Sequence, residues 1–207
     1  MNPAFPLLLA LSAGFAHAFE ADHLVAVSSL VTRRATARLA VQDGIFWGLG
    51  HTSTLLLVSS VYLLGRFVLR AGDFRYLEAG VGLMLVGLGS YRLWKVLRQQ
   101  DVARDHNHGP PAFSLAYGVG MMHGLAGSGA LLLSVLTQLR GTWNSLAYLL
   151  VFGLGSVGGM MVAAGAFSLP FSTRFLDSKP LRQLLTLLSA LVCLGLGLKI
   201  VYENLHG

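Results

Sequence analysis

The sequence predicts an all-α polytopic membrane protein, with six transmembrane helices arranged as two inverted three-helix repeats. Hydrophobic residues make up 54% of the 207 residues and charged residues only 12%, with a mean hydropathy of +0.64. In soluble proteins about 25% of residues are charged. The apolar residues form blocks about 20 residues long, which is enough to cross a hydrocarbon core of about 30 Å as a helix. Similar motifs recur in the same order in both halves, which indicates the repeat.

Six apolar blocks, each bounded by charge or proline, are the candidate spans. They are Ala4–Val31, Gly44–Gly65, Leu77–Leu97, Phe113–Leu139, Trp143–Leu169 and Leu181–Leu205. Each is expected to be helical, because an open sheet edge in lipid leaves backbone groups unpaired. We expect residues 1–97 to form a first three-helix unit, residues 98–112 a cytoplasmic linker that contains histidines, and residues 113–207 a second three-helix unit.

The basic residues, which give a net charge of +6, lie mainly between the blocks. This placement favours a role in membrane orientation over nucleic-acid binding. The first, third and fifth connectors hold ten Lys and Arg residues, with Arg92 counted in the third, and the opposite side holds five. Because cytoplasmic loops are enriched in Lys and Arg, we expect both termini outside the plasma (inner) membrane. Ala16–Ala18 resembles a signal-peptide cleavage site, but no Lys or Arg precedes the apolar run, so we expect this segment to be retained.

The repeat appears when the sequence is shifted by about 106 residues. Gly14–Ala18 aligns with Gly120–Gly124, Trp47–His51 with Phe152–Ser156, and Gly87–Gly89 with Gly195–Gly197, at offsets of 106, 105 and 108 residues. Each half contains three spans, and an odd number brings the second half into the membrane from the opposite face. Inverted repeats of this kind are the architecture of many secondary transporters, which bind their substrate near the midplane between the repeats.

Four ionisable residues lie inside the first apolar block: His17, Glu20, Asp22 and His23. A carboxylate at the centre of a transmembrane helix costs about 2.5–3.5 kcal/mol even on insertion scales. Neither Lys nor Arg lies within nine residues of this segment on either side. A divalent metal ion bound by carboxylate and imidazole is the simplest compensation for these charges.

Helix geometry limits how these four side chains can converge. At about 100° per residue, His17, Glu20 and His23 share one face, while Asp22 points away from His17. A regular helix therefore cannot direct His17 and Asp22 at one ion. Either the helix is unwound near Ala18–Ala21, or the ion engages backbone atoms as well.

Two further histidines are candidates for the same site. His51 is the only ionisable residue deep in the second block, and His123 is the repeat counterpart of His17. For each of them, a hydrogen bond to a neighbouring helix is the alternative to metal binding. Glu20 could be a ligand, a proton acceptor during coupling, or a partner of His51. The predicted metal residues are His17, Asp22, His23, His51, Glu20 and His123.

Other features narrow the functional class. Cys193 is the only cysteine, which excludes a disulfide scaffold, a Cys-x-x-Cys redox pair and an all-cysteine zinc site. A His-Glu-x-x-His zinc-protease motif and a serine or cysteine nucleophile motif are absent from the sequence, so we expect no enzyme. The methionines are better explained by apolar packing than by Cu(I) binding. The polar run Asp105–His108 is better explained as a solvated linker than as a metal trap.

The segment His17–His23 matches the His-x4-Asp-His signature of the nickel/cobalt transporter family (NiCoT, NicO), and Gly50–Ser53 resembles its second motif. Typical members have eight spans and acidic motifs in the later half, whereas Gly120–Leu133 contains no acid here. The chain therefore resembles more closely the short, six-span urease-accessory-like members. The resemblance implies a permease for Ni²⁺ or Co²⁺, with metal recognition by His17, Asp22, His23 and His51.

The sequence thus predicts a permease that binds Ni²⁺ or Co²⁺ near the midplane as its transported substrate, without an organic cofactor. The alternatives are a non-transporting accessory protein that delivers metal to a maturation partner, and a transporter or exporter of another metal such as copper. The sequence contains no P-loop, so coupling would use a gradient or a separate energising subunit. The expected partners are the ion and the lipid bilayer; a homo-oligomer is compatible with the sequence, and nucleic acid is not expected.

Overall fold

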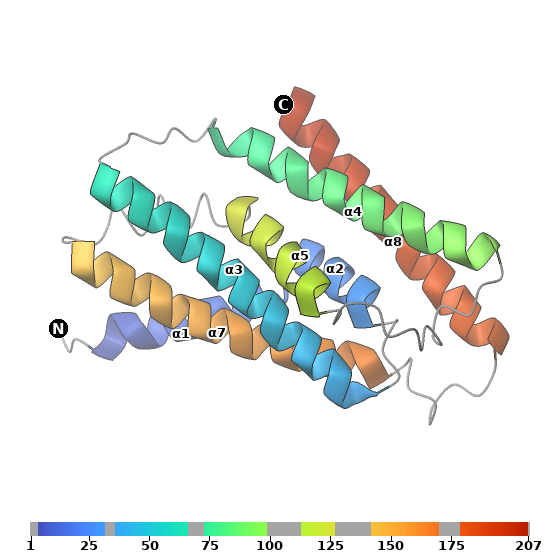
Figure 1. Cartoon of the computed structure of the whole chain (residues 1–207), viewed down its shortest axis with the longest axis horizontal. Helices are drawn as coiled ribbons and strands as arrows, with labels where there is room; N and C mark the ends of the chain where they lie inside the picture. Colours follow the sequence, from blue (N-terminus) through green and yellow to red (C-terminus); the bar gives the residue numbers. More distant parts are fainter. Residues whose placement is uncertain are drawn as a thin grey trace.

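A computed structural model describes residues 4–31, 36–65, 73–98, 113–126, 142–169 and 179–206. Within these residues the chain forms α-helices and no strands (Figure 1). The helices are α1 (Ala4–His17), α2 (Ala21–Val31), α3 (Ala37–Gly65), α4 (Asp73–Leu97), α5 (Phe113–Ala126), α7 (Thr142–Ser168) and α8 (Lys179–His206). The all-helical fold class is confirmed for the described residues.

Three of the described helices are long and apolar enough to cross a membrane, by length and composition. The qualifying segments are Ala37–Val61 in α3, Trp143–Ser168 in α7 and Gln183–His206 in α8. The predicted third span corresponds to α4, and α5 covers the predicted fourth span as far as Ala126; the rest of that span lies outside the described residues. The protein is therefore a helical membrane protein.

The first apolar block is not one continuous helix, because α1 ends at His17 and α2 begins at Ala21. At the break, the amide of Phe19 donates to the carbonyl of Ala16 at 2.9 Å, and the amide of Glu20 donates to the carbonyl of His17 at 3.1 Å. These three-residue spacings tighten the last turn of α1 and end it. Of the two alternatives that the sequence left open, the unwound helix is confirmed.

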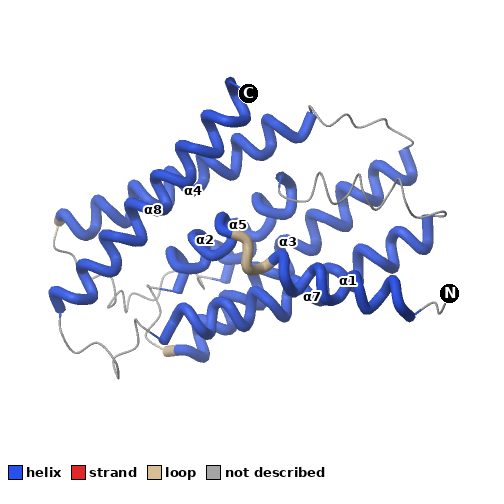
Figure 2. The backbone as a smooth tube through the Cα atoms, turned by 180° about the vertical axis from the view of Figure 1, so that it is seen from behind, coloured by secondary structure: helices blue, strands red, loops and turns tan. Residues whose placement is uncertain are grey.

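The helices form two groups, which are joined by α2 and by a direct contact between α4 and α5. Helix α3 packs along α7 and α5, α1 packs along α7, and α4 pairs with α8, as Figure 1 shows. Helix α2 contacts α3, α5 and α7 on one side and α4 and α8 on the other. The same arrangement is seen from behind in Figure 2. The break between α1 and α2 therefore lies beside helices from both halves of the sequence.

Glycines allow the closest helix contacts. A Cβ added at Gly14 of α1 would collide with the carbonyl of Phe152 on α7, and one added at Gly120 of α5 would collide with the carbonyl of Trp47 on α3. Small residues at such positions let backbones approach closely in membranes. In the repeat alignment Gly14 corresponds to Gly120, and Phe152 corresponds to Trp47. The Gly14–Phe152 contact and the Gly120–Trp47 contact are therefore equivalent under the repeat. In the first contact the first half supplies the glycine, and in the second contact the second half supplies it.

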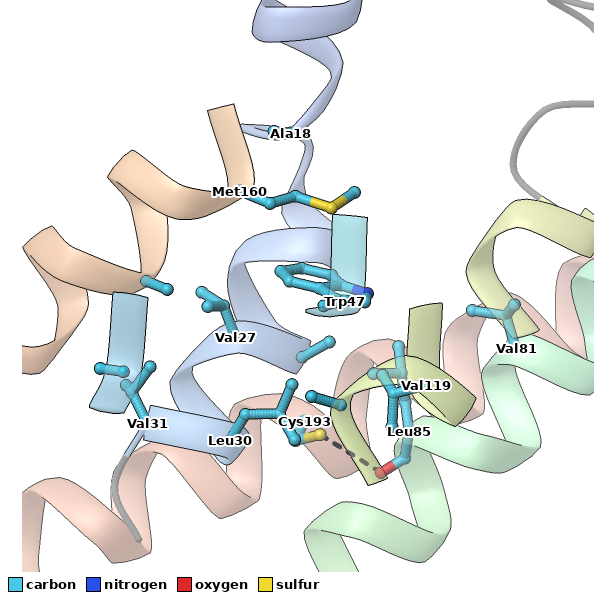
Figure 3. Packing of buried hydrophobic residues seen from close by; sticks show 14 residues of the cluster. Ala18, Val27, Leu30, Val31, Trp47, Val81, Leu85, Val119, Met160 and Cys193 are labelled. Atoms are coloured by element: carbon cyan, nitrogen blue, oxygen red, sulfur yellow. Dashed lines mark hydrogen bonds between the residues drawn. The ribbon is translucent and has the colours of Figure 1, made fainter. Parts of the chain in front are cut away.

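The main buried cluster surrounds α2 and brings together α3, α4, α5, α7 and α8 (Figure 3). Trp47 and Met160 are fully buried in it, and the thiol of Cys193 donates to the carbonyl of Leu85 at 3.2 Å. Met160 therefore packs as an apolar side chain, as predicted, whereas Met121 and Met122 are exposed. This packing fixes α2 beside the histidine-bearing helices.

Candidate metal centre

Four buried histidines from four helices meet at the break between α1 and α2. His17 is the last residue of α1, His23 lies in the first turn of α2, His51 lies in α3, and His123 lies in α5. His23, His51 and His123 are fully buried, and His17 is 3% exposed. The sequence predicted each of them as a candidate, and the fold brings all four together.

His23 lies at the centre of this group. Its ring centroid is 4.5 Å from that of His17, 5.6 Å from that of His51 and 4.8 Å from that of His123. The centroids of His17 and His51 are 5.2 Å apart. The Trp47 ring lies 5.5 Å from His23 and 5.6 Å from His123 and covers one side of the group. Side chains more than 100 positions apart in the chain therefore form one cluster.

Hydrogen bonds set the tautomers of three of these histidines. The Nδ1 atom of His123 lies 3.1 Å from the carbonyl oxygen of Val119; a carbonyl only accepts, so Nδ1 carries the proton. The Nδ1 atom of His17 donates to Glu20 Oε1 at 2.8 Å, and that of His23 donates to Asp22 Oδ1 at 3.0 Å. In the neutral form of each ring, this hydrogen bond leaves the lone pair on Nε2. Metal-binding histidines are oriented in the same way, with the other ring nitrogen donating to an oxygen.

These lone pairs lack partners within the described residues. The unpaired buried atoms include Nε2 of His17, His23 and His123 and both ring nitrogens of His51. A buried polar atom without a hydrogen bond costs about 1–3 kcal/mol. A metal cation accepts such lone pairs, so these nitrogens are candidate metal ligands.

Two overlapping sets of potential ligands occur in the described part of the chain. One contains His17, His23 and His51, and the other contains Asp22, His23 and His123; within each set the ligand atoms lie within 4.8 Å of one another. Asp22 Oδ2 is 3.9 Å from His123 Nε2. Imidazole nitrogens with a carboxylate oxygen suit divalent transition metals. The break allows Asp22 to point toward the cluster, which a continuous helix would prevent.

The two acids have different positions at the break. Asp22 is in the first turn of α2, where the positive end of the helix dipole stabilises a carboxylate, and its side chain is 22% exposed. Glu20 is 56% exposed and, among the described residues, belongs to neither set of potential ligands. Its contact is to His17 and not to His51. Glu20 therefore accepts a hydrogen bond from His17, a contact that was not among the three roles predicted for it.

Sequence reasoning missed a second buried polar cluster and misplaced its central residue. Arg92 was counted in the third connector, but it lies within α4 and is 1% exposed. Its Nη1 atom donates to Ser29 of α2 at 3.1 Å and to Ser189 of α8. Arg92 falls inside the predicted span Leu77–Leu97, and an ionisable residue within a span is itself a signal of a buried site. Its charge is therefore no evidence for membrane orientation.

A comparison with known proteins finds a relative that is similar in sequence over most of the chain. The chain is 33% identical over 177 residues to a urease accessory protein UreH from Bacillus sp. (strain TB-90). The aligned region covers 80% of this chain and 77% of the relative. The chain belongs to the UreH family. No protein-family model and no solved structure matches this UreH-family protein. The resemblance to urease-accessory-like proteins is thereby confirmed at the level of the family, and the relative's name is that of an accessory protein, not an enzyme.

Proposed function

We propose that this UreH-family protein is a membrane permease for a divalent transition-metal ion, with Ni²⁺ or Co²⁺ as the transported substrate. The observation that carries the proposal is the set of buried histidine nitrogens that face one another without partners in the described residues. Unpaired polar groups are expensive in a membrane interior, and a bound cation would compensate for them. In this proposal the bound ion is cargo that passes through the protein.

The proposed ligands are His17, His23, His51, Asp22 and His123, with Glu20 orienting His17. Mixed nitrogen and oxygen donors favour Ni²⁺ and Co²⁺ over Mg²⁺ and Ca²⁺, which prefer all-oxygen shells. Cu²⁺ would bind more tightly by affinity order alone, so selectivity would depend on geometry and on metal availability. The relation to a urease accessory protein supports nickel as the ion.

The proposed architecture is two inverted three-helix repeats with the ion between them. The exchanged contacts Gly14–Phe152 and Gly120–Trp47 support it. A second exchanged pair supports it further, because Gly48 packs against Val157 and Gly153 packs against Thr52. The site itself contains ligands from both halves, as expected for a substrate site at a repeat interface. The charge asymmetry of the connectors supports a plasma-membrane location with both termini outside.

Purified protein in liposomes tests the permease directly. We expect ⁶³Ni²⁺ to accumulate in vesicles that contain the wild type and not in vesicles that contain His17→Ala or Asp22→Ala. The matched control is His206→Ala, because this histidine is exposed at the end of α8. Undiminished accumulation in both site variants would disprove the site assignment.

A second candidate function is that of a membrane accessory protein that delivers metal to a maturation partner. The name of the UreH relative favours it. The same liposomes distinguish the two functions, because a permease moves the ion without any partner. Metal binding with no flux in vesicles, but with transfer to added urease maturation proteins, would favour delivery.

A further inference from the structure

We propose that the ion occupies two overlapping positions in turn, with His23 as the ligand common to both. One position consists of His17, His23 and His51, and the other of Asp22, His23 and His123. The inference rests on the proposed function in treating the ion as cargo, and adds that the site holds one ion and passes it between two ligand sets.

The hydrogen bonding of His23 implies that the two positions are filled alternately. Its Nδ1 atom donates to Asp22 Oδ1, so only Nε2 remains to bind metal, and this atom is unpaired in the described part of the protein. One nitrogen lone pair binds one ion. Two complete sets cannot therefore be occupied together, and an ion that changes position remains attached to His23.

The two positions differ in exposure and in donor type. In the carboxylate position the histidines are fully buried but Asp22 is 22% exposed, whereas every ligand of the three-imidazole position is almost entirely buried. The carboxylate position is therefore the accessible one, where a partly hydrated ion can exchange water for an oxygen ligand. The three-imidazole position is the enclosed one, which the ion reaches only after it replaces oxygen by nitrogen.

This order makes His51 a specificity-determining residue. Mg²⁺ and Ca²⁺ can enter a position with a carboxylate, but they do not readily exchange oxygen for imidazole nitrogen. Gly124 of α5 directly follows His123 and packs against the backbone of His51. This contact fixes the distance between His51 and the second position. Ions that accept nitrogen ligands would move on to His51, and the others would not.

Metal analysis of the purified protein with Ni²⁺ tests the inference. We expect the wild type to bind one ion per chain in equilibrium dialysis. His51→Ala should still bind one ion, and X-ray absorption should show two imidazoles with a carboxylate oxygen. His123→Ala should also bind one ion, with three imidazoles. Asp22→Asn preserves the shape of the side chain. It should bind the ion through the same three imidazoles as His123→Ala.

Each contrary outcome overturns the inference. Two ions per wild-type chain would mean that the positions fill independently. Loss of all binding in monodisperse His51→Ala or in Asp22→Asn would mean one composite site. If His51→Ala does not fold, His51→Gln replaces it in the same measurement.

The proposed function fails separately from this inference. Flux of Ni²⁺ through a single composite site would leave the permease intact and disprove the two positions. Two alternative ligand sets without flux in liposomes would leave the positions intact and disprove the permease.

Discussion

Helix α2 contacts two buried polar clusters, and only one of them includes a positively charged side chain. Near its first turn, histidine nitrogens and Asp22 face one another, with several lone pairs unpaired in the described residues. Near its last turn, the cation is part of the protein, because Arg92 is buried and donates to Ser29 and Ser189. The Arg92 cluster contains its own positive charge, whereas in our proposal a metal ion supplies the positive charge of the histidine cluster. We therefore assign ion binding to the histidine cluster and helix packing to the Arg92 cluster.

The largest effect is expected for His23→Ala, because His23 belongs to both ligand sets. Loss of a hydrogen-bond partner of a ligand already lowers metal affinity about 10–100-fold, so loss of the shared ligand should lower it at least about 100-fold. Isothermal titration with Ni²⁺ measures the change. The control is His206→Ala, which should bind as the wild type does. Retained affinity in His23→Ala would remove the distinction between the two clusters.

A smaller effect is expected for Glu20→Ala, which removes the acceptor that orients His17. We expect a loss of about 10–100-fold in Ni²⁺ affinity, as for other hydrogen-bond partners of metal ligands. Glu20→Gln preserves an oxygen acceptor and should recover part of the affinity. Equal loss in the two variants would indicate that the charge of Glu20 matters and not its hydrogen bond.

The smallest effect is expected at the Arg92 cluster, where Ser29→Ala removes one hydrogen bond to the guanidinium and the weak hydrogen bond from this hydroxyl to Cys193 Sγ. Interhelical hydrogen bonds in membranes contribute about 0.6 kcal/mol on average and up to about 1.7 kcal/mol. Thermal unfolding in detergent should show a small drop in Tm, with unchanged Ni²⁺ affinity.

Ser28→Ala is the matched control for this comparison. Ser28 lies beside Ser29 in α2, but its hydroxyl donates to the carbonyl of Val25 within the same helix. In both serine variants, Ni²⁺ at about 100 times its Kd should still stabilise the protein by about 2.7 kcal/mol. A loss of Ni²⁺ affinity in Ser29→Ala alone would mean that the Arg92 cluster takes part in ion binding.

The sequence predicted much of the candidate site because the signals are local. An ionisable residue within an apolar block is visible without any structure, and this signal identified His17, His23 and His51. Helix periodicity also showed that Asp22 could not join His17 on a regular helix, which pointed to the break. The same local signal was present at Arg92 but was interpreted as part of a connector, because its position near the end of a span concealed its burial.

The partners of these residues could not be predicted in the same way. Glu20 had several compatible partners, and its contact with His17 depends on the tight turn that ends α1. Whether His51 and His123 bond to neighbouring helices or join the cluster depends on how α3 and α5 pack. The composition of the two blocks does not contain that information.

The sequence by itself determined that the chain is helical and membrane-embedded, and which ionisable side chains lie within its apolar blocks. These properties follow from hydropathy and periodicity, which act over a few helical turns. Only the tertiary structure decided that His17, His23, His51 and His123 share one cluster and that Arg92 belongs to another. The physical reason is that glycine contacts between residues about 70 to 140 positions apart set the helix pairing, and this pairing brings distant side chains within a few ångströms.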